Sequence, residues 1–253
     1  MHTIAVAGKG GVGKTTISGM LVDYLCKKGT GPVLVVDADA NANLNEVLGV
    51  PADITLGTIR EEMAHAEMKG TIPAGMTKAD YAEFKFNSAL IEEDDFDMLI
   101  MGRTQGKGCY CYVNGVLKTL VDKYAKNYSY IVMDNEAGLE HVARGTLPHV
   151  DTMLLISDCS RRGIQAAARV AETIEEMELK PGRLGLIVNR APEGKLDAGI
   201  LEEIEKHGLT LFGVLPQDDA VYRCDCDGAP SAKLPEANPV KTALHGILKE
   251  LDL

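Results

Sequence analysis

The stretch Gly8-Lys9-Gly10-Gly11-Val12-Gly13-Lys14-Thr15 decides the fold, because it has the spacing G-x-x-x-x-G-K-[ST] of a phosphate-binding P-loop. An apolar run typical of a buried strand, Thr3–Ala7, precedes it, and a helical pattern, Thr15–Lys28, follows it. Glycines let the backbone curl around a phosphate with its N–H groups pointing inward, and the helix N-terminus adds positive potential. The strand and helix on either side distinguish this motif from a chance glycine-rich turn.

We therefore predict that the loop binds a nucleoside triphosphate. Lys14 can reach the β- and γ-phosphates, and the Thr15 hydroxyl can be a ligand of Mg²⁺. The residues expected at the triphosphate are Gly8, Lys9, Gly10, Gly11, Val12, Gly13, Lys14, Thr15 and Thr16.

Strand and helix signals alternate along the rest of the chain. The apolar runs are mostly continuous, as expected for a parallel sheet covered on both faces. After Thr3–Ala7 they are Val33–Val36, Met98–Met101, Tyr130–Met133, Met153–Ile156, Leu184–Val188 and Leu211–Leu215. Helical patterns cover Thr15–Lys28, Val113–Lys126, Gly163–Met177, Ile200–His207 and Val240–Leu251. This alternation predicts a three-layer, doubly wound α/β fold with a mostly parallel central sheet flanked by helices.

The least regular segment is Pro51–Asp97, which contains the acidic patches Glu61-Glu62 and Glu92-Glu93-Asp94-Asp95. No internal repeat, low-complexity tract or linker separates it from the rest. We therefore expect one domain over residues 1–253, with residues 55–95 as an elaboration of it.

Composition and charge exclude several classes of function. The net charge of −11 over 253 residues disfavours a nucleic-acid interface, which needs clustered Lys and Arg. No apolar run reaches the ~18 residues of a membrane span. The N-terminus lacks the basic and apolar regions of a signal peptide. We expect a cytoplasmic protein without a membrane partner, in which the six cysteines are reduced.

Lys9 is a second lysine within the loop, although a P-loop requires only one. In this the motif resembles the deviant Walker A of the ATPase family that contains MinD, ParA, the nitrogenase iron protein and the arsenite-pump ATPase. The resemblance implies a homodimer in which Lys9 reaches the partner's nucleotide and takes part in catalysis. The alternative is a solvated surface lysine.

The same resemblance implies roles for polar residues at the ends of predicted strands. Asp39 would orient or deprotonate the attacking water, and Asp37 would support Mg²⁺ and the loop. Asn189 corresponds to the family's adenine-reading asparagine. The second base-side loop would contain Pro216, Gln217 and Asp218.

Asp134 follows the run Tyr130–Met133 and has the position of a Walker B carboxylate that holds Mg²⁺ through water. Gly138 can present its N–H to the γ-phosphate. Each strand-end residue taken alone could be an ordinary turn residue or helix cap. Because an intact P-loop precedes them, we interpret them as parts of one nucleotide switch.

Cys109-Tyr110-Cys111 lies between a predicted strand and a predicted helix. On extended backbone, cysteines two residues apart point to one side and could bind one metal ion, whereas a helix would splay them. A nearby helix N-terminus favours thiolates. Two such pairs in a symmetric dimer would give the four sulfurs that suit Zn²⁺ or Ni²⁺. The alternative is two small residues without a ligand.

Three motifs together narrow the resemblance. They are the deviant P-loop, Gly108-Cys109-Tyr110-Cys111-Tyr112-Val113-Asn114 and the segment Asp134–His141. Over nearly its full length the chain resembles the maturation ATPases of carbon monoxide dehydrogenase and acetyl-CoA synthase, the CooC/AcsF type. This implies ATP-dependent nickel insertion into a client enzyme, with Cys109 and Cys111 as metal ligands.

The other cysteines have less defined roles. Cys224-Asp225-Cys226 is not a hallmark of that family, and it is either a second metal site or local variation. We expect Cys26 and Cys159 to be structural, and His141 to be an interface residue more than a ligand.

Three other functions are alternatives for a chain with these motifs. An iron protein-like reductase is disfavoured because no cysteine lies between Cys111 and Cys159. An iron–sulfur scaffold ATPase is the main alternative, since a C-x-C pair can hold a cluster. A MinD/ParA-like positioning ATPase would need a basic DNA-binding face or a basic amphipathic C-terminal helix, and Val240–Leu253 is not markedly basic.

Overall fold

A mixed sheet forms the centre of the protein, in which strands far apart in the chain lie side by side. The computed structural model describes residues 1–103, 110–137, 146–147 and 149–253, and only the backbone of residues 110–112. The strand order within this part is β3-β4-β2-β5-β1-β6-β7-β8. The strands are β1 (His2–Gly8), β2 (Val33–Ala38), β3 (Ile91–Glu92), β4 (Phe96–Ile100), β5 (Tyr130–Asn135), β6 (Thr152–Asp158), β7 (Arg183–Ala191) and β8 (Leu211–Pro216).

All neighbouring strands pair in parallel except β3, which runs antiparallel to β4 at the edge of the sheet. Strand β1 occupies the middle, between β5 and β6, and its Val6 is in register with Asp134. Asp37 on β2 is in register with the same Asp134. The sheet therefore brings the end of β1 and the carboxylates of β2 and β5 to one edge, and the predicted α/β fold is confirmed.

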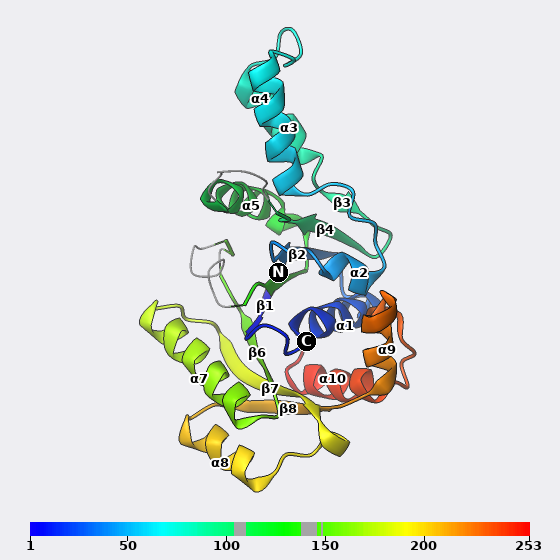
Figure 1. Ribbon diagram of the computed structural model, residues 1–253, viewed down its shortest axis with the longest axis vertical. Coiled ribbons are helices and arrows are strands. Elements are labelled where there is room, and N and C mark those ends of the chain that lie inside the picture. Colours follow the sequence, from blue (N-terminus) through cyan, green and yellow to red (C-terminus); the bar gives the residue numbers. More distant parts are fainter. Residues whose placement is uncertain (104–109, 138–145, 148) are drawn as a thin grey trace.

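Helices cover both faces of the sheet and enclose two apolar cores (Figure 1). One core joins the sheet to α5, α7 and α8, and the other joins it to α1, α2 and α10. The helices are α1 (Lys14–Lys28), α2 (Leu44–Leu48), α3 (Leu56–Lys69), α4 (Lys78–Asn87), α5 (Tyr110–Tyr124), α7 (Arg161–Glu176), α8 (Ala198–Lys206), α9 (Asp219–Asp227) and α10 (Pro239–Glu250).

Each predicted strand and helix exists, with ends shifted by a few residues. The largest shift in a strand is at Leu184–Val188, where β7 begins at Arg183 and ends at Ala191. Strand β3 and helices α2, α3, α4 and α9 were not predicted. Strand β3 has only two residues, which is too short for a pattern of alternation.

Helices α3 and α4 form a hairpin that projects from the edge of the sheet (Figure 1). The segment Pro51–Asp97 is therefore more regular than we expected. Reciprocal capping boxes at Thr55 and Thr77 begin the two helices. Few of their side chains are buried, Phe86 alone on α4, so the apolar periodicity that identifies a helix is weak here.

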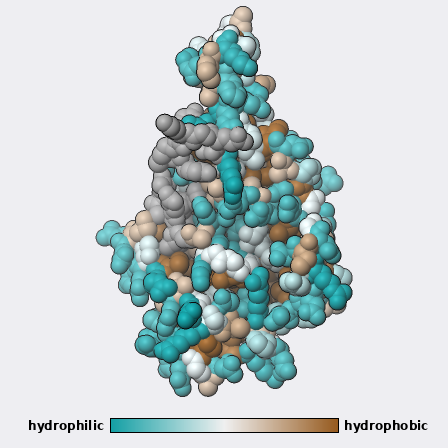
Figure 2. All heavy atoms as spheres, viewed as in Figure 1, coloured by the Kyte–Doolittle hydropathy of each residue, from teal (hydrophilic) through white to brown (hydrophobic). Residues whose placement is uncertain are grey.

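The visible surface is hydrophilic over most of its area, with hydrophobic residues in small scattered groups (Figure 2). Within the described residues, no helix combines the length and the apolar character needed to cross a membrane.

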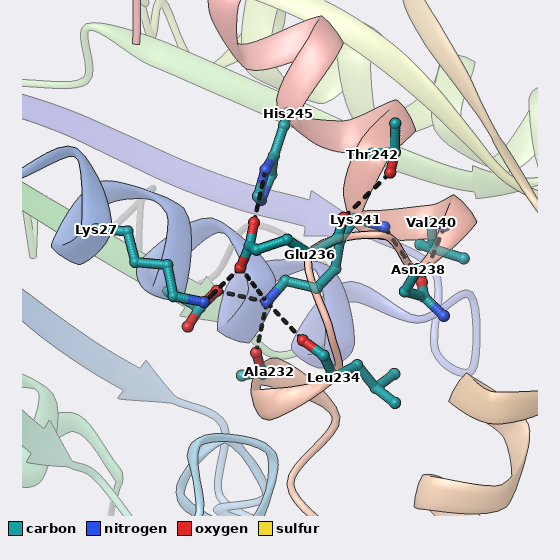
Figure 3. A network of polar contacts seen from close by, with 10 residues as sticks. Lys27, Ala232, Leu234, Glu236, Asn238, Val240, Lys241, Thr242 and His245 are labelled. Carbon is teal, nitrogen blue, oxygen red and sulfur yellow. Dashed lines mark hydrogen bonds and ion pairs between the residues drawn. The ribbon is translucent and has the colours of Figure 1, made fainter.

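A buried lysine on the C-terminal helix, α10, forms an ion pair with a residue of α1 and contacts the segment before α10 (Figure 3). Lys241 is fully buried, and its amine lies 2.5 Å from Asp23 Oδ2 and 3.1 Å from Glu236 Oε1. It also donates to the carbonyl oxygens of Ala232 and Leu234, at 2.9 and 3.0 Å. All the donors of the ammonium group are therefore used, as a buried charge requires.

We predict that Lys241→Met lowers the free energy of unfolding by about 3 kcal/mol, because it leaves buried acceptors and carboxylates without their cation. Urea denaturation at neutral pH measures this change. Lys249→Met, on the exposed side of the same helix, should change stability by less than about 0.5 kcal/mol. Equal unfolding midpoints for the two variants would contradict the role given to Lys241.

Candidate nucleotide-binding site

The P-loop connects β1 to α1 and is packed closely against the neighbouring strands. Gly8 ends β1 with φ +147°, and a Cβ there would lie 2.3 Å from the carbonyl oxygen of Ile156 on β6. Gly13 precedes α1 with φ +94°, and its Cβ would lie 2.5 Å from Asn189 Nδ2 on β7. Only glycine satisfies both the backbone conformation and the available space at these two positions.

The side chain of Lys14 lies against the backbone of the P-loop. Lys14 is buried, and its amine donates to the carbonyl oxygen of Lys9 at 3.3 Å. Burial lowers the pKa of the Lys14 ammonium, while Asp134, Asp39 and Glu136 oppose this change. The amine therefore lies within the field of several carboxylates, at the mouth of the loop.

Two buried carboxylates lie beside the loop, as the sequence predicted. Asp134 accepts hydrogen bonds from the hydroxyls of Thr15 and Ser18, the latter at 3.0 Å. Asp37 accepts from the backbone N–H groups of Asp39 and Leu44, both at 3.0 Å. Burial, chiefly, raises the pKa of Asp134 to about 6, and burial followed by repulsion from Asp134 raises that of Asp37 to about 7.

This arrangement fits Mg²⁺, which the P-loop implies. The Thr15 hydroxyl and the Asp134 carboxylate are hydrogen-bonded to each other, and Asp37 is in register with Asp134. Oxygen ligands of this kind suit Mg²⁺. The raised pKa values mean that ionised carboxylates are costly here without a cation. Mg²⁺ held here by the Thr15 hydroxyl, with Asp134 and Asp37 beside it, would neutralise the charge of the phosphates.

Asp39 and Lys9 lie at the surface of the same edge. Asp39 directly follows β2, and its Oδ1 accepts the backbone N–H of Asn41 at 2.8 Å. The Lys9 side chain is exposed and forms no ion pair with any residue in the described part of the chain. Gly138 and His141 lie outside the described residues. The catalytic roles of Asp39 and Lys9 stay predictions.

The predicted base-side residues come together in one cleft next to the P-loop. Asn189, Pro216, Gln217 and Asp218 line it together with Thr16, which lies on the first turn of α1. The cleft has a volume of about 490 Å³. It therefore continues the phosphate site on the side of β7 and β8, where a base would lie.

Among the cleft residues that sequence reasoning missed are the polar side chains of Arg190, Tyr222 and Asp225. Tyr222 and Asp225 belong to α9, which had no recognisable pattern. Tyr222 is 67% exposed. A possible signal was Asp218, a good helix N-cap immediately before these residues.

A bridge between two helix caps fixes the base-side loop. Asp218 Oδ1 accepts from the backbone N–H groups of Ala220 and Val221 and so caps α9. The same oxygen accepts from Asn238 Nδ2 at 3.0 Å. Because Asn238 Oδ1 caps α10, the position of the loop depends on the packing of the C-terminal helix.

The cysteines are distributed over several elements. Cys109 lies outside the described residues, and α5 begins at Tyr110, so the backbone at Cys111 is helical. The sequence placed Cys111 before a helix that begins at Val113, and this boundary is wrong because α5 already includes Cys111. Cys224 and Cys226 lie on α9, where their spacing turns them to different sides. The described residues contain no group of three or more His, Cys, Asp or Glu that could hold a metal ion.

Cys26 and Cys159 lie where the sequence placed them. Cys26 is on α1, its thiol donates to the carbonyl oxygen of Asp95, and burial raises its pKa to about 12. Cys159 follows β6, and its thiol donates to the carbonyl oxygen of Arg190 at 3.4 Å.

A glycine loop between the central strand and the first helix, with two buried carboxylates beside it, defines a P-loop nucleotide-binding protein. The chain belongs to the CobQ/CobB/MinD/ParA nucleotide binding domain family, whose model matches residues 3–231. It therefore has the ATP-binding domain of the MinD/ParA class.

Two relatives cover almost the whole chain. The chain is 42% identical to an uncharacterized ATP-binding protein of Methanocaldococcus jannaschii, over 98% of this chain and 97% of the relative. It is 32% identical to the carbon monoxide dehydrogenase accessory protein CooC of Rhodospirillum rubrum, over 89% of this chain and 87% of the relative.

Solved structures share the fold at lower identity. A ParA family ATPase from Chlorobium tepidum superposes with a TM-score of 0.73 at 19% identity, covering 99% of this chain and 98% of that chain. The septum site-determining protein MinD of Pyrococcus horikoshii, complexed with Mg-ADP, gives 0.71 at 22% identity, covering 99% and 96%.

We predict that Asp134→Asn stabilises the protein without nucleotide or Mg²⁺ at pH 8 by about 1–3 kcal/mol. The raised pKa means that ionising Asp134 costs stability, and this cost grows as the pH rises from 3.8 through about 6. At pH 4 the variant should match the parent. Urea denaturation at both pH values tests this. Adding Mg-ATP at pH 8 should stabilise the parent more than the variant, and an equal gain in both would contradict the metal role of Asp134.

Proposed function

We propose that the protein is an ATP-driven, dimerising carrier that delivers nickel to a client enzyme, carbon monoxide dehydrogenase or acetyl-CoA synthase. The observation that carries this proposal is the coincidence of a complete P-loop with the Cys109/Cys111 pair in a chain that is 32% identical to CooC. CooC is described as a carbon monoxide dehydrogenase accessory protein.

The position of α5 supports a link between nucleotide and metal. Strand β4 runs parallel to β2, so it ends at the same edge of the sheet as Asp37. The chain then continues to α5, whose first turn includes Cys111. Cys111 therefore follows a strand that ends at the edge where the triphosphate would bind.

Each part of the nucleotide site would have its own role in ATP binding and hydrolysis. The loop N–H groups and Lys14 bind the phosphates, and the cleft beside Asn189 takes the base. Lys9 is exposed, as a residue that crosses to a partner subunit must be. Asp39 orients the attacking water. Hydrolysis changes metal affinity only if the two nucleotide states hold the cysteines differently.

A dimer would complete the coordination of the metal ion. One chain supplies two thiolates, and a second copy would complete four sulfurs around one Ni²⁺ or Zn²⁺. Nucleotide-dependent closure of the dimer would then control whether the metal is held or released.

We predict that Cys109→Ser combined with Cys111→Ser abolishes nickel binding while ATP hydrolysis continues. Anaerobic nickel titration with and without ATP, read together with molecular mass, should give one metal per two chains for the parent. The matched control is Cys224→Ser with Cys226→Ser, which should bind nickel like the parent. Unchanged stoichiometry in the Cys109/Cys111 variant would remove these residues from the site.

The anaerobically prepared protein also distinguishes nickel delivery from the two alternative functions. A brown protein with iron and acid-labile sulfide would replace nickel delivery by an iron–sulfur scaffold. Binding to anionic liposomes or to DNA at low salt would favour a positioning ATPase. Against the liposome outcome, the apolar residues Val240, Leu244, Ile247 and Leu248 of α10 are buried in the core.

We predict that Lys9→Ala leaves ATP affinity within about threefold of the parent and weakens ATP-dependent dimerisation by about tenfold or more, because its charge acts on the partner's nucleotide. Light scattering against protein concentration measures the dimer. Lys126→Ala is the control, an exposed lysine before β5 at the opposite edge of the sheet. An unchanged dimer in Lys9→Ala would refute the role across subunits.

A further inference from the structure

Arg190, near the end of β7, has an unusual backbone conformation. Its φ of +58° lies in the left-handed region, which costs a residue with a side chain of this size on the order of 1 kcal/mol or more. Two contacts hold it there. Its N–H donates to Asn189 Oδ1 at 2.9 Å, and its carbonyl accepts from the Cys159 thiol at 3.4 Å.

This conformation brings two adjacent side chains onto two consecutive carbonyls of the P-loop. The Arg190 guanidinium donates to the carbonyl oxygen of Gly11 at 3.0 Å. Asn189 Nδ2 donates to the carbonyl oxygen of Val12 at 2.9 Å. These contacts come from the β7 side of the loop.

The orientation of a carbonyl fixes the orientation of the N–H in the same peptide unit, because the two point in opposite directions across a planar trans peptide. The Gly11 carbonyl belongs to the peptide whose N–H is that of Val12. The Val12 carbonyl belongs to the peptide whose N–H is that of Gly13. Holding both carbonyls toward β7 therefore turns both N–H groups away from it, into the loop.

We propose that Arg190 is a positioning residue of the phosphate site. Through the Gly11 carbonyl it orients the Val12 N–H toward the triphosphate, while Asn189 does the same for the Gly13 N–H. Arg190 itself does not touch the nucleotide. This inference rests on triphosphate binding by the P-loop, which the proposed function also requires.

If Arg190 contacted the nucleotide directly, its substitution would change ligand affinities in another pattern. Its side chain also lines the base cleft, so it could contact the base or the sugar directly. A direct contact would affect ATP but not inorganic tripolyphosphate, which has neither base nor sugar. Orientation of the loop would affect both ligands by the same factor.

The test measures dissociation constants of Mg-ATP and Mg-tripolyphosphate by calorimetry for the parent and three Arg190 variants. Arg190→Ala and Arg190→Gly both remove the guanidinium, and Gly also relieves the left-handed backbone. We expect both to lose about tenfold in affinity for both ligands. Arg190→Lys keeps a cationic donor and should stay within about threefold of the parent.

Arg162→Ala is the control for charge, since Arg162 is exposed on the first turn of α7 and should bind both ligands like the parent. Thermal unfolding without ligand identifies any loss that comes from unfolding. The proposal is overturned if Arg190→Gly binds tripolyphosphate as tightly as the parent does, whether or not Arg190→Ala also does. A parent that binds neither ligand overturns the nucleotide site itself.

Discussion

The tight fit of the P-loop against β6 and β7 is the constraint on which the rest of the site depends. Gly8 lies against the Ile156 carbonyl and Gly13 against the Asn189 amide, both closer than any Cβ would allow. Because β1 lies in the middle of the sheet, the loop receives Asp134 from β5 on one side and Asn189 from β7 on the other. The order of the strands thus assembles a phosphate site, two carboxylates and a base cleft at one edge.

The strands and the main helices could be predicted because long apolar runs had to be buried on both faces of a sheet. The hairpin of α3 and α4 could not, because its helices depend on caps at Thr55 and Thr77 more than on a buried face. Helix α9 has no fully buried residue, so it too lacked a pattern. Local capping is weak evidence in a sequence, since the same residues form turns.

The sequence predicted those site residues whose positions follow from the geometry of a parallel sheet. Asp37 and Asp134 end neighbouring parallel strands, so they had to meet. Arg190 could not be found in this way, because a left-handed arginine has no signature in the sequence. The start of α5 was placed too late, because its apolar pattern begins at Val113 whereas the helix begins at Tyr110 and so includes Cys111.

The buried thiol of Cys26 has a practical chemical meaning. Thiol reagents attack the thiolate, and burial, which raises the pKa of Cys26 to about 12, keeps this thiol almost entirely protonated at pH 7. Alkylating agents or mercurials applied briefly to the folded protein should therefore pass over this position. A fluorophore attached through sulfur would instead report from more accessible cysteines such as the exposed Cys226 of α9, with α1 as a silent background.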